Sequence, residues 1–149
     1  MSFTGVENLD RSIDKVNSWL ADIDAGFETG DRRLAYRVLR AWLHGLRDRL
    51  TVPAAAHFAA QLPDLLRGVF YDGWTPNRVP HKYDRSEFAA RFAREARVRE
   101  TEVAKAAGIV TAVARGHMTD GVVAQTLGQL PADLRGLLSP EASALAGAR

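Results

Sequence analysis

The chain contains no cysteine, which excludes disulfide bonds, thiolate metal ligands and a cysteine nucleophile. It also lacks an apolar run of about 18 residues, the length that a membrane-spanning helix needs. Its first residues, MSFTGVENLDRSIDK, include early acids and no apolar core of signal-peptide length. We therefore expect a cytoplasmic protein with no membrane partner.

Motifs of known catalytic or metal-binding chemistry are missing too. Neither HxxxH nor HExxH spacing relates the four histidines, which are His44, His57, His81 and His117. No DxDxDG calcium loop, GxSxG motif or glycine-rich phosphate loop occurs. We therefore expect no metal, no cofactor and no catalytic residue, and hence no enzyme. An active site that only the fold assembles stays an alternative.

Lysine is scarce, with three residues against 17 arginines, at a formal net charge of +2 over 149 residues. Arginine makes planar, bidentate contacts, so the bias can indicate recognition of an anionic partner. The 18 acids are spread among the basic residues, however, and composition alone predicts no strong field of one sign. A genomic preference for arginine is the simpler interpretation.

One apolar stripe opens the chain, with spacings of three and four in turn: Val6, Leu9, Ile13, Val16, Leu20, Ile23 and Phe27. This spacing predicts a helix of about 22 residues with one buried face. It also matches a coiled-coil seam, but three heptads are few, so packing within the same chain is favoured.

A second helix is predicted over about residues 32–50, with Asp31 as its N-cap. One face is apolar, and the opposite face is basic: Arg33, Arg37, Arg40, His44 and Arg47. The favoured interpretation of the basic face is a solvated outer surface. The alternative is contact with nucleic-acid phosphates, although no DNA-binding module accompanies it.

Further helices are predicted over about residues 53–61, from Pro63, from Ser86, around residues 103–114, over about 121–128 and from Pro131. Thr51 and Ser86 are the expected caps of two of them. No segment alternates with period two, so the fold class is all-α, with about seven to eight helices. Arg49 projects near the edge of an apolar face and is expected to find a carboxylate, either Asp64 or Asp72.

Two similar phrases lie 68 residues apart, QLPDLLRGVF at 61–70 and QLPADLRGLL at 129–138. The same order of helices and turns surrounds both phrases, which indicates a duplicated helical unit. We expect repeats over about 6–71 and 84–139, a linker over 72–83 and a frayed tail over 140–149. The repeats are expected to pack with pseudo-twofold symmetry as one compact bundle, a single domain spanning residues 1–149.

Each Leu-Pro phrase is interpreted as a structural corner between helices, because proline suits a helix start and leucine a core. The two arginines of the phrases, Arg67 and Arg135, are expected to pair with helix ends or carboxylates. The linker segment YDGWTP occurs once. Tyr71 and Trp74 either form a binding patch or, as favoured, Trp74 folds back and seals the seam between the repeats.

The combination of LRAWLHGLRDRL, AAQLPDLLRG, YDGWTP and QLPADLRGLL resembles the bacterial family DUF2267 over essentially the whole chain. The resemblance implies an all-α duplicated fold and a prokaryotic source. It implies no activity and no site residues. Three functional hypotheses follow: a non-enzymatic protein that binds a protein partner or itself, a nucleic-acid binder using the arginine face, and a ligand binder or enzyme with a pocket between the repeats.

Overall fold

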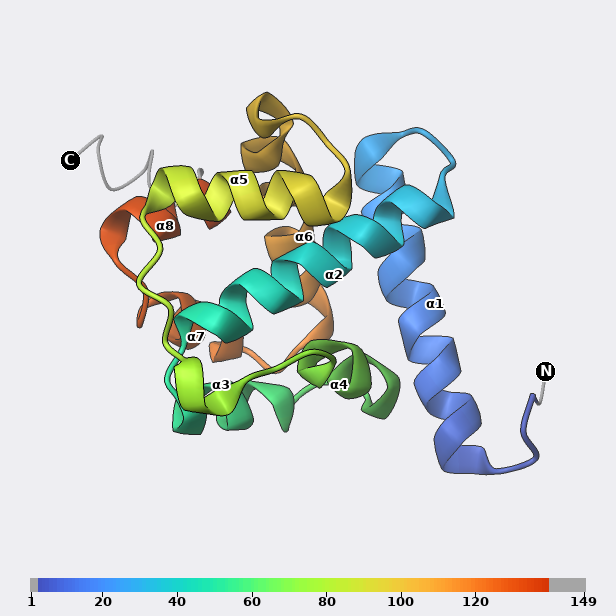
Figure 1. Ribbon diagram of the computed structural model, residues 1–149. Helices are drawn as coiled ribbons and strands as arrows, with labels where there is room; N and C mark the ends of the chain where they lie inside the picture. Colours follow the sequence, from blue (N-terminus) through green and yellow to red (C-terminus); the bar gives the residue numbers. More distant parts are fainter. Residues whose placement is uncertain (1–2, 140–149) are drawn as a thin grey trace.

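The computed structural model describes residues 3–139, and every regular element among them is helical (Figure 1). The α-helices are α1 (Glu7–Phe27), α2 (Arg32–Arg49), α3 (Val52–Ala59), α4 (Asp64–Tyr71), α5 (Arg85–Ala96), α6 (Val103–His117), α7 (Val122–Leu127) and α8 (Ala132–Leu138). Two short 3-10 helices, η1 (Pro76–Arg78) and η2 (Glu100–Glu102), precede α5 and α6. The all-α prediction is confirmed. The tail 140–149, predicted to fray, lies outside the described residues.

Within residues 3–139, no helix is both long enough and apolar enough to span a membrane.

The helix starts follow local hydrogen-bonding chemistry. The Asp31 carboxylate accepts from the backbone N–H of Arg33 at 3.0 Å, and the Thr51 hydroxyl accepts from that of Ala54 at 3.3 Å, as predicted. The predicted cap of α5 is wrong, because Asp84 rather than Ser86 fills that role. The Asp84 carboxylate accepts from the backbone N–H at position 87, and a charged acceptor makes the stronger cap.

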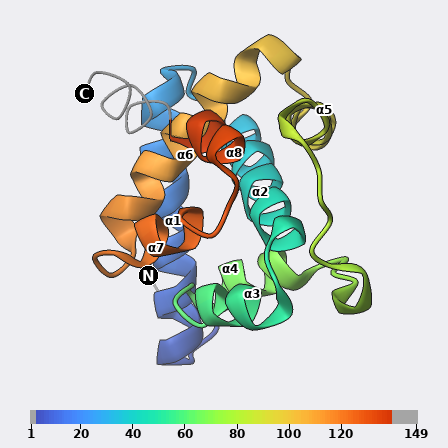
Figure 2. The ribbon, with the colours of Figure 1, turned by 90° about the vertical axis from the view of Figure 1, so that its left-hand side faces the viewer.

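Helix α2 lies at the centre of the bundle, with α1, α4, α5 and α6 packed around it (Figures 1 and 2). Its predicted apolar face is fully buried: Ala35, Val38, Leu39, Trp42, Leu43, Leu46 and Leu50. Because helices approach from several directions, α2 has little free surface left. This central position decides what its basic face can do.

We call α1–α4 the first half of the chain and α5–α8 the second half. The first helix of each half packs against the long helix of the other half, α1 on α6 and α5 on α2. Glycine allows close approach at both crossings. A Cβ on Gly26 of α1 would lie 2.7 Å from the Ile109 side chain of α6. A Cβ on Gly45 of α2 would lie 2.8 Å from the Phe88 ring of α5. The two halves are therefore interlocked rather than stacked side by side.

The two Leu-Pro phrases form corners of nearly the same geometry. Pro63 precedes α4 with φ −55° and ψ 148°, and Pro131 precedes α8 with φ −56° and ψ 152°. The leucine before each proline, Leu62 and Leu130, is buried. Both phrases are thus parts of the scaffold, as interpreted from the sequence. The pseudo-twofold relation between the halves stays a prediction.

Candidate functional site

The basic side of α2 meets the C-terminal ends of two other helices instead of solvent. The Nε–H of Arg37 donates to the carbonyl of Ala96, the last residue of α5, at 2.9 Å. Arg47 donates through Nη1 to the carbonyls of Phe70 and Asp72 at the end of α4, at 3.0 and 2.7 Å. Cations suit these positions because helix C-termini carry unpaired carbonyls and negative partial charge.

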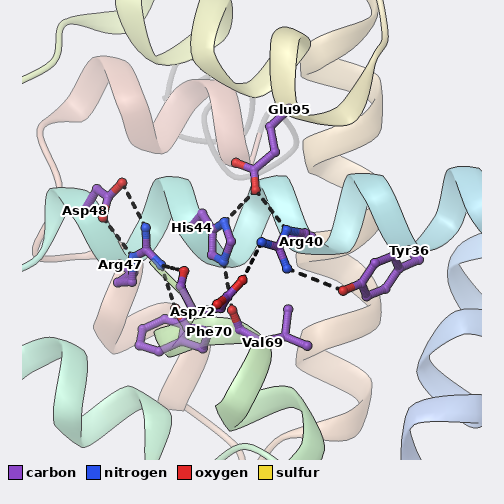
Figure 3. A network of polar contacts seen from close by, with 9 residues as sticks. All are labelled: Tyr36, Arg40, His44, Arg47, Asp48, Val69, Phe70, Asp72 and Glu95. Atoms are coloured by element: carbon purple, nitrogen blue, oxygen red, sulfur yellow. Dashed lines mark hydrogen bonds and ion pairs between the residues drawn. The ribbon is translucent and has the colours of Figure 1, made fainter. Parts of the chain in front are cut away.

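His44 and Arg40 complete this polar network, which Figure 3 shows from close by. The His44 ring contacts the Glu95 carboxylate through Nδ1 at 2.5 Å and the Val69 carbonyl through Nε2 at 2.7 Å. Arg40 bonds the Asp72 carboxylate at 2.7 Å and lies 3.5 Å from that of Glu95. Glu95 belongs to α5, so the network joins three helices.

The prediction of a solvated basic face is therefore wrong for most of its members. His44 and Arg47 are only 7% and 5% exposed, Arg37 and Arg40 are half-buried, and only Arg33 is exposed. The helical period correctly placed all five residues on one side, but it gave no sign that α5 and the end of α4 cover that side. Arg37, Arg40 and Arg47 already bond carbonyls or carboxylates of the fold, so Arg33 is the exposed member of this face, and nucleic-acid binding stays a prediction.

Asp72 gives the network a pH dependence with a definite sign. The hydrogen bond from Arg40 holds the pKa of the Asp72 carboxyl below its ordinary value near 3.8, and the same contact raises the pKa of Arg40. A carboxyl with a lowered pKa in the folded state stabilises the fold above its unfolded pKa. That contribution disappears as the pH falls through the folded value.

We therefore expect Asp72→Asn to be less stable than the wild type at pH 6, with the difference shrinking below the ordinary carboxyl pKa near 3.8 and vanishing once the pH lies below the lowered pKa of the folded state. Urea denaturation of both proteins between pH 2 and pH 7 measures this difference. Asp64→Asn, at a carboxylate 3.6 Å from an arginine and no closer, is the matched control and should show a smaller change. A gap between Asp72→Asn and the wild type that does not vary with pH would contradict the assignment.

The arginines that were predicted to pair within the fold differ in whether the structure confirms the pairing. Arg67 wraps the C-terminal end of α3, donating to the carbonyls of Ala59, Ala60 and Leu62 at 2.9–3.3 Å, so its pairing with a helix end is confirmed. Arg135, its counterpart in the second phrase, is exposed, and its side chain makes no hydrogen bond or ion pair within residues 3–139. The pairing predicted for Arg135 is therefore not seen there.

Arg49 does not pair with either predicted carboxylate. Asp64 lies 3.6 Å from Arg67, and Asp72 is bound to Arg40. The Nε of Arg49 is buried and has no hydrogen-bond partner in the described part of the chain. The edge position of Arg49 was predicted correctly, but its partners were not, because both acids have nearer arginines.

Trp74 and Tyr71 fold inward rather than forming an open aromatic patch. Their ring centroids lie 5.1 Å apart, Tyr71 also contacts the buried Phe70 ring at 5.3 Å, and both residues pack against the core. The indole N–H of Trp74 is buried without an acceptor among the described residues. Trp74 thus folds back onto the core, while its sealing of a seam between the repeats stays a prediction.

A cavity of about 230 Å³ lies between α2 of the first half and α5 of the second. Its walls are Ala41, His44, Gly45, Asp48, Tyr83, Phe88, Arg91, Phe92, Arg94 and Glu95. The cavity lies where α2 meets α5; the repeats, and hence a pocket between them, stay a prediction. Of the candidate site residues predicted from the sequence, His44 is the one that lines this cavity.

An apolar surface at the N-terminal end of α1 was not expected. Phe3, Val6 and Leu9 are 47–58% exposed, and Leu65 of α4 is 48% exposed. The backbone N–H of Leu65 donates to the Ser12 hydroxyl, so the first turn of α4 lies against α1 beside Leu9. Figure 1 shows this end of α1 extending past α4. We call these four residues the α1 apolar end.

The α1 apolar end contradicts the prediction that the whole stripe is buried. From Val16 onward the stripe packs on the core, and Ile23 is fully buried. The earlier residues are less covered, because α4 meets this part of α1 at Ser12 but leaves Val6 and Leu9 exposed. The regular spacing over three heptads could have indicated this exposure, because the stripe is longer than the helices that pack against it.

Comparison with known proteins gives a family but no activity. The model of a family described as an uncharacterized conserved protein, DUF2267, matches residues 16–137. No curated protein matches the chain. The candidate sites therefore rest on the contacts and exposure of this chain's own residues. Among residues 3–139, no three His, Asp or Glu side chains gather in a way that would hold a metal ion.

Proposed function

The chain belongs to the DUF2267 family of uncharacterized conserved proteins, and from this premise we propose that it is a non-enzymatic protein that binds a helical partner through the α1 apolar end. The observation that carries the proposal is the joint exposure of Phe3, Val6, Leu9 and Leu65, four large apolar side chains on adjoining segments. Large apolar side chains exposed on neighbouring segments are typical of a protein-binding site. A bacterial source and a cytoplasmic location stay predictions.

The charge of α1 favours a basic partner. Between Glu7 and Phe27 the helix has five acids against two bases, a net charge of −3, although the whole chain carries +2. Pairing α1 with α1 of a second copy would bring like charges together, which is unfavourable across an interface. An anionic membrane surface would be repelled for the same reason. A helix with an apolar stripe flanked by lysine or arginine fits both the shape and the charge.

The test uses a synthetic 14-residue helix of leucine and lysine, and a second peptide in which glutamate replaces lysine. We expect the lysine peptide to bind at least tenfold more tightly in fluorescence anisotropy. Replacing both Leu9 and Leu65 by serine removes apolar area from the interface and should lower this affinity about tenfold. Val52→Ser is the matched control, because Val52 is similarly exposed but lies on α3, and it should change the affinity less than twofold.

Equal binding of both peptides, or equal binding by the Leu9 and Leu65 variant, would contradict the proposal. Sedimentation of the unmodified chain separates the remaining possibilities. A dimer that the same two substitutions dissociate would make the occupant a second copy. Binding of anionic vesicles that the substitutions abolish would make it a membrane surface.

A further inference from the structure

The cavity between α2 and α5 has an uneven distribution of charge. Of its four charged residues, the two acids already have partners: Asp48 is paired with Arg47 at 2.8 Å, and Glu95 with His44 and Arg40. The two bases, Arg91 and Arg94, have no ion pair or hydrogen bond recorded within residues 3–139. The wall therefore presents two arginines that form no ion pair, beside two carboxylates that are already paired.

The two arginines are positioned to act together. They are three residues apart on α5, a spacing that places side chains on the same helix face. The Arg91 guanidinium lies over the Tyr83 ring, 4.1 Å from its centroid, so it is held at the cavity edge by a cation–π contact. Tyr83 stacks in turn on His81 with parallel rings, and the backbone N–H of His81 donates to the Asp48 carbonyl at 2.7 Å. The linker thereby fixes one side of the opening.

The floor of the cavity is apolar and closed. Ala41 and Gly45 of α2 face Phe88 and Phe92 of α5. At Gly45 the two helices are so close that no further side-chain atom fits against Phe88. The cavity thus combines apolar and aromatic lining residues with two arginines, a combination that suits an apolar group bearing an anion.

The size of the cavity limits the ligand. Sites for drug-sized molecules and cofactors measure about 300–1,000 Å³. At about 230 Å³ this cavity is smaller, so it excludes a dinucleotide and suits a single ring with one charged substituent. We propose that the α2–α5 cavity binds a small organic anion, a carboxylate or phosphate monoester on a planar apolar group, with Arg91 and Arg94 holding the anion. This site is separate from the α1 apolar end.

Three probes of similar size test the proposal: benzoate, phenyl phosphate and the neutral benzyl alcohol. Titration followed by heteronuclear NMR should show millimolar or tighter binding of at least one anion, as expected for ligands of so few atoms. Shifted resonances should include those of Gly45 and Tyr83. Benzyl alcohol should bind at least tenfold more weakly, because it cannot pair with a guanidinium. The relative affinities of the first two probes distinguish a carboxylate from a phosphate ligand.

Variants at exposed positions keep the fold intact while removing the charge. Arg91→Gln and Arg94→Gln should each lower the affinity for the anion about tenfold, the effect of losing one charge-assisted contact. Arg33→Gln removes the same charge from an exposed position outside the cavity and should change the affinity less than twofold. The proposal is overturned if benzyl alcohol binds as tightly as the anions, or if no anion binds at 10 mM, which is about ten times the expected dissociation constant. It is also overturned if the Arg91 and Arg94 variants bind the anion as tightly as Arg33→Gln does.

Discussion

Replacing Arg47 by methionine is expected to lower the free energy of unfolding by about 3–5 kcal/mol. Arg47 is 5% exposed and donates to two carbonyls at the end of α4 and to the Asp48 carboxylate. Methionine fills a similar volume but supplies no donor. The substitution therefore leaves a buried carbonyl, a partly buried carbonyl and a carboxylate without their partner. The cost of stranding buried polar groups exceeds the net worth of the bonds themselves.

Arg49→Met is the matched control for this prediction, since it makes the same exchange two residues later on the same helix. The Nε of Arg49 is buried and has no partner in residues 3–139, so its removal deprives no recorded acceptor of a bond. We expect a change within about 0.5 kcal/mol, or a small gain in stability. Urea denaturation with a shared m-value measures both variants. Similar losses for Arg47→Met and Arg49→Met would show that guanidinium burial, and not the bonds to α4, sets the cost.

Much of the backbone could be predicted from the sequence, because helix starts and corners depend on a few neighbouring residues. Asp31 and Thr51 cap as expected, since a short polar side chain before an apolar run satisfies the first free N–H groups. Pro63 and Pro131 open α4 and α8 in nearly identical conformations. These features require no knowledge of what packs against them.

The surfaces could not be predicted in the same way, because periodicity gives the direction of a helix face and not what lies in front of it. The basic face of α2 was expected in solvent, yet His44 and Arg47 lie under α5 and α4. The start of the α1 stripe was expected in the core, yet Val6 and Leu9 lie in solvent. Both errors concern contacts between residues distant in the chain. The basic face of α2 was wrongly placed in solvent because arginine is also tolerated in a buried site where helix ends supply carbonyls.

Trp42→Ala is expected to lower the free energy of unfolding by about 3–5 kcal/mol, the range for removing a large buried aromatic side chain. Trp42 of α2 is fully buried, and its ring centroid lies 6.0 Å from that of Phe58. Its indole N–H donates to the Thr111 hydroxyl of α6 at 3.0 Å. The same hydroxyl donates to the Leu138 carbonyl at the end of α8. Trp42 thus bonds to α6, and the hydroxyl that it contacts also ties α6 to the end of α8.

Trp42→Phe separates the packing of this side chain from its hydrogen bond. Phenylalanine keeps most of the ring volume, so the loss should be clearly smaller than for alanine. A double-mutant cycle with Thr111→Val, measured by urea denaturation, isolates the contact across the halves, and we expect a coupling energy of about 0.5–1.5 kcal/mol. A coupling energy near zero would mean that apolar packing alone joins α2 to α6. A value in the expected range would mean that the buried hydroxyl also fixes how the two halves are oriented, because a hydrogen bond tolerates far less sliding of α2 along α6 than an apolar contact does.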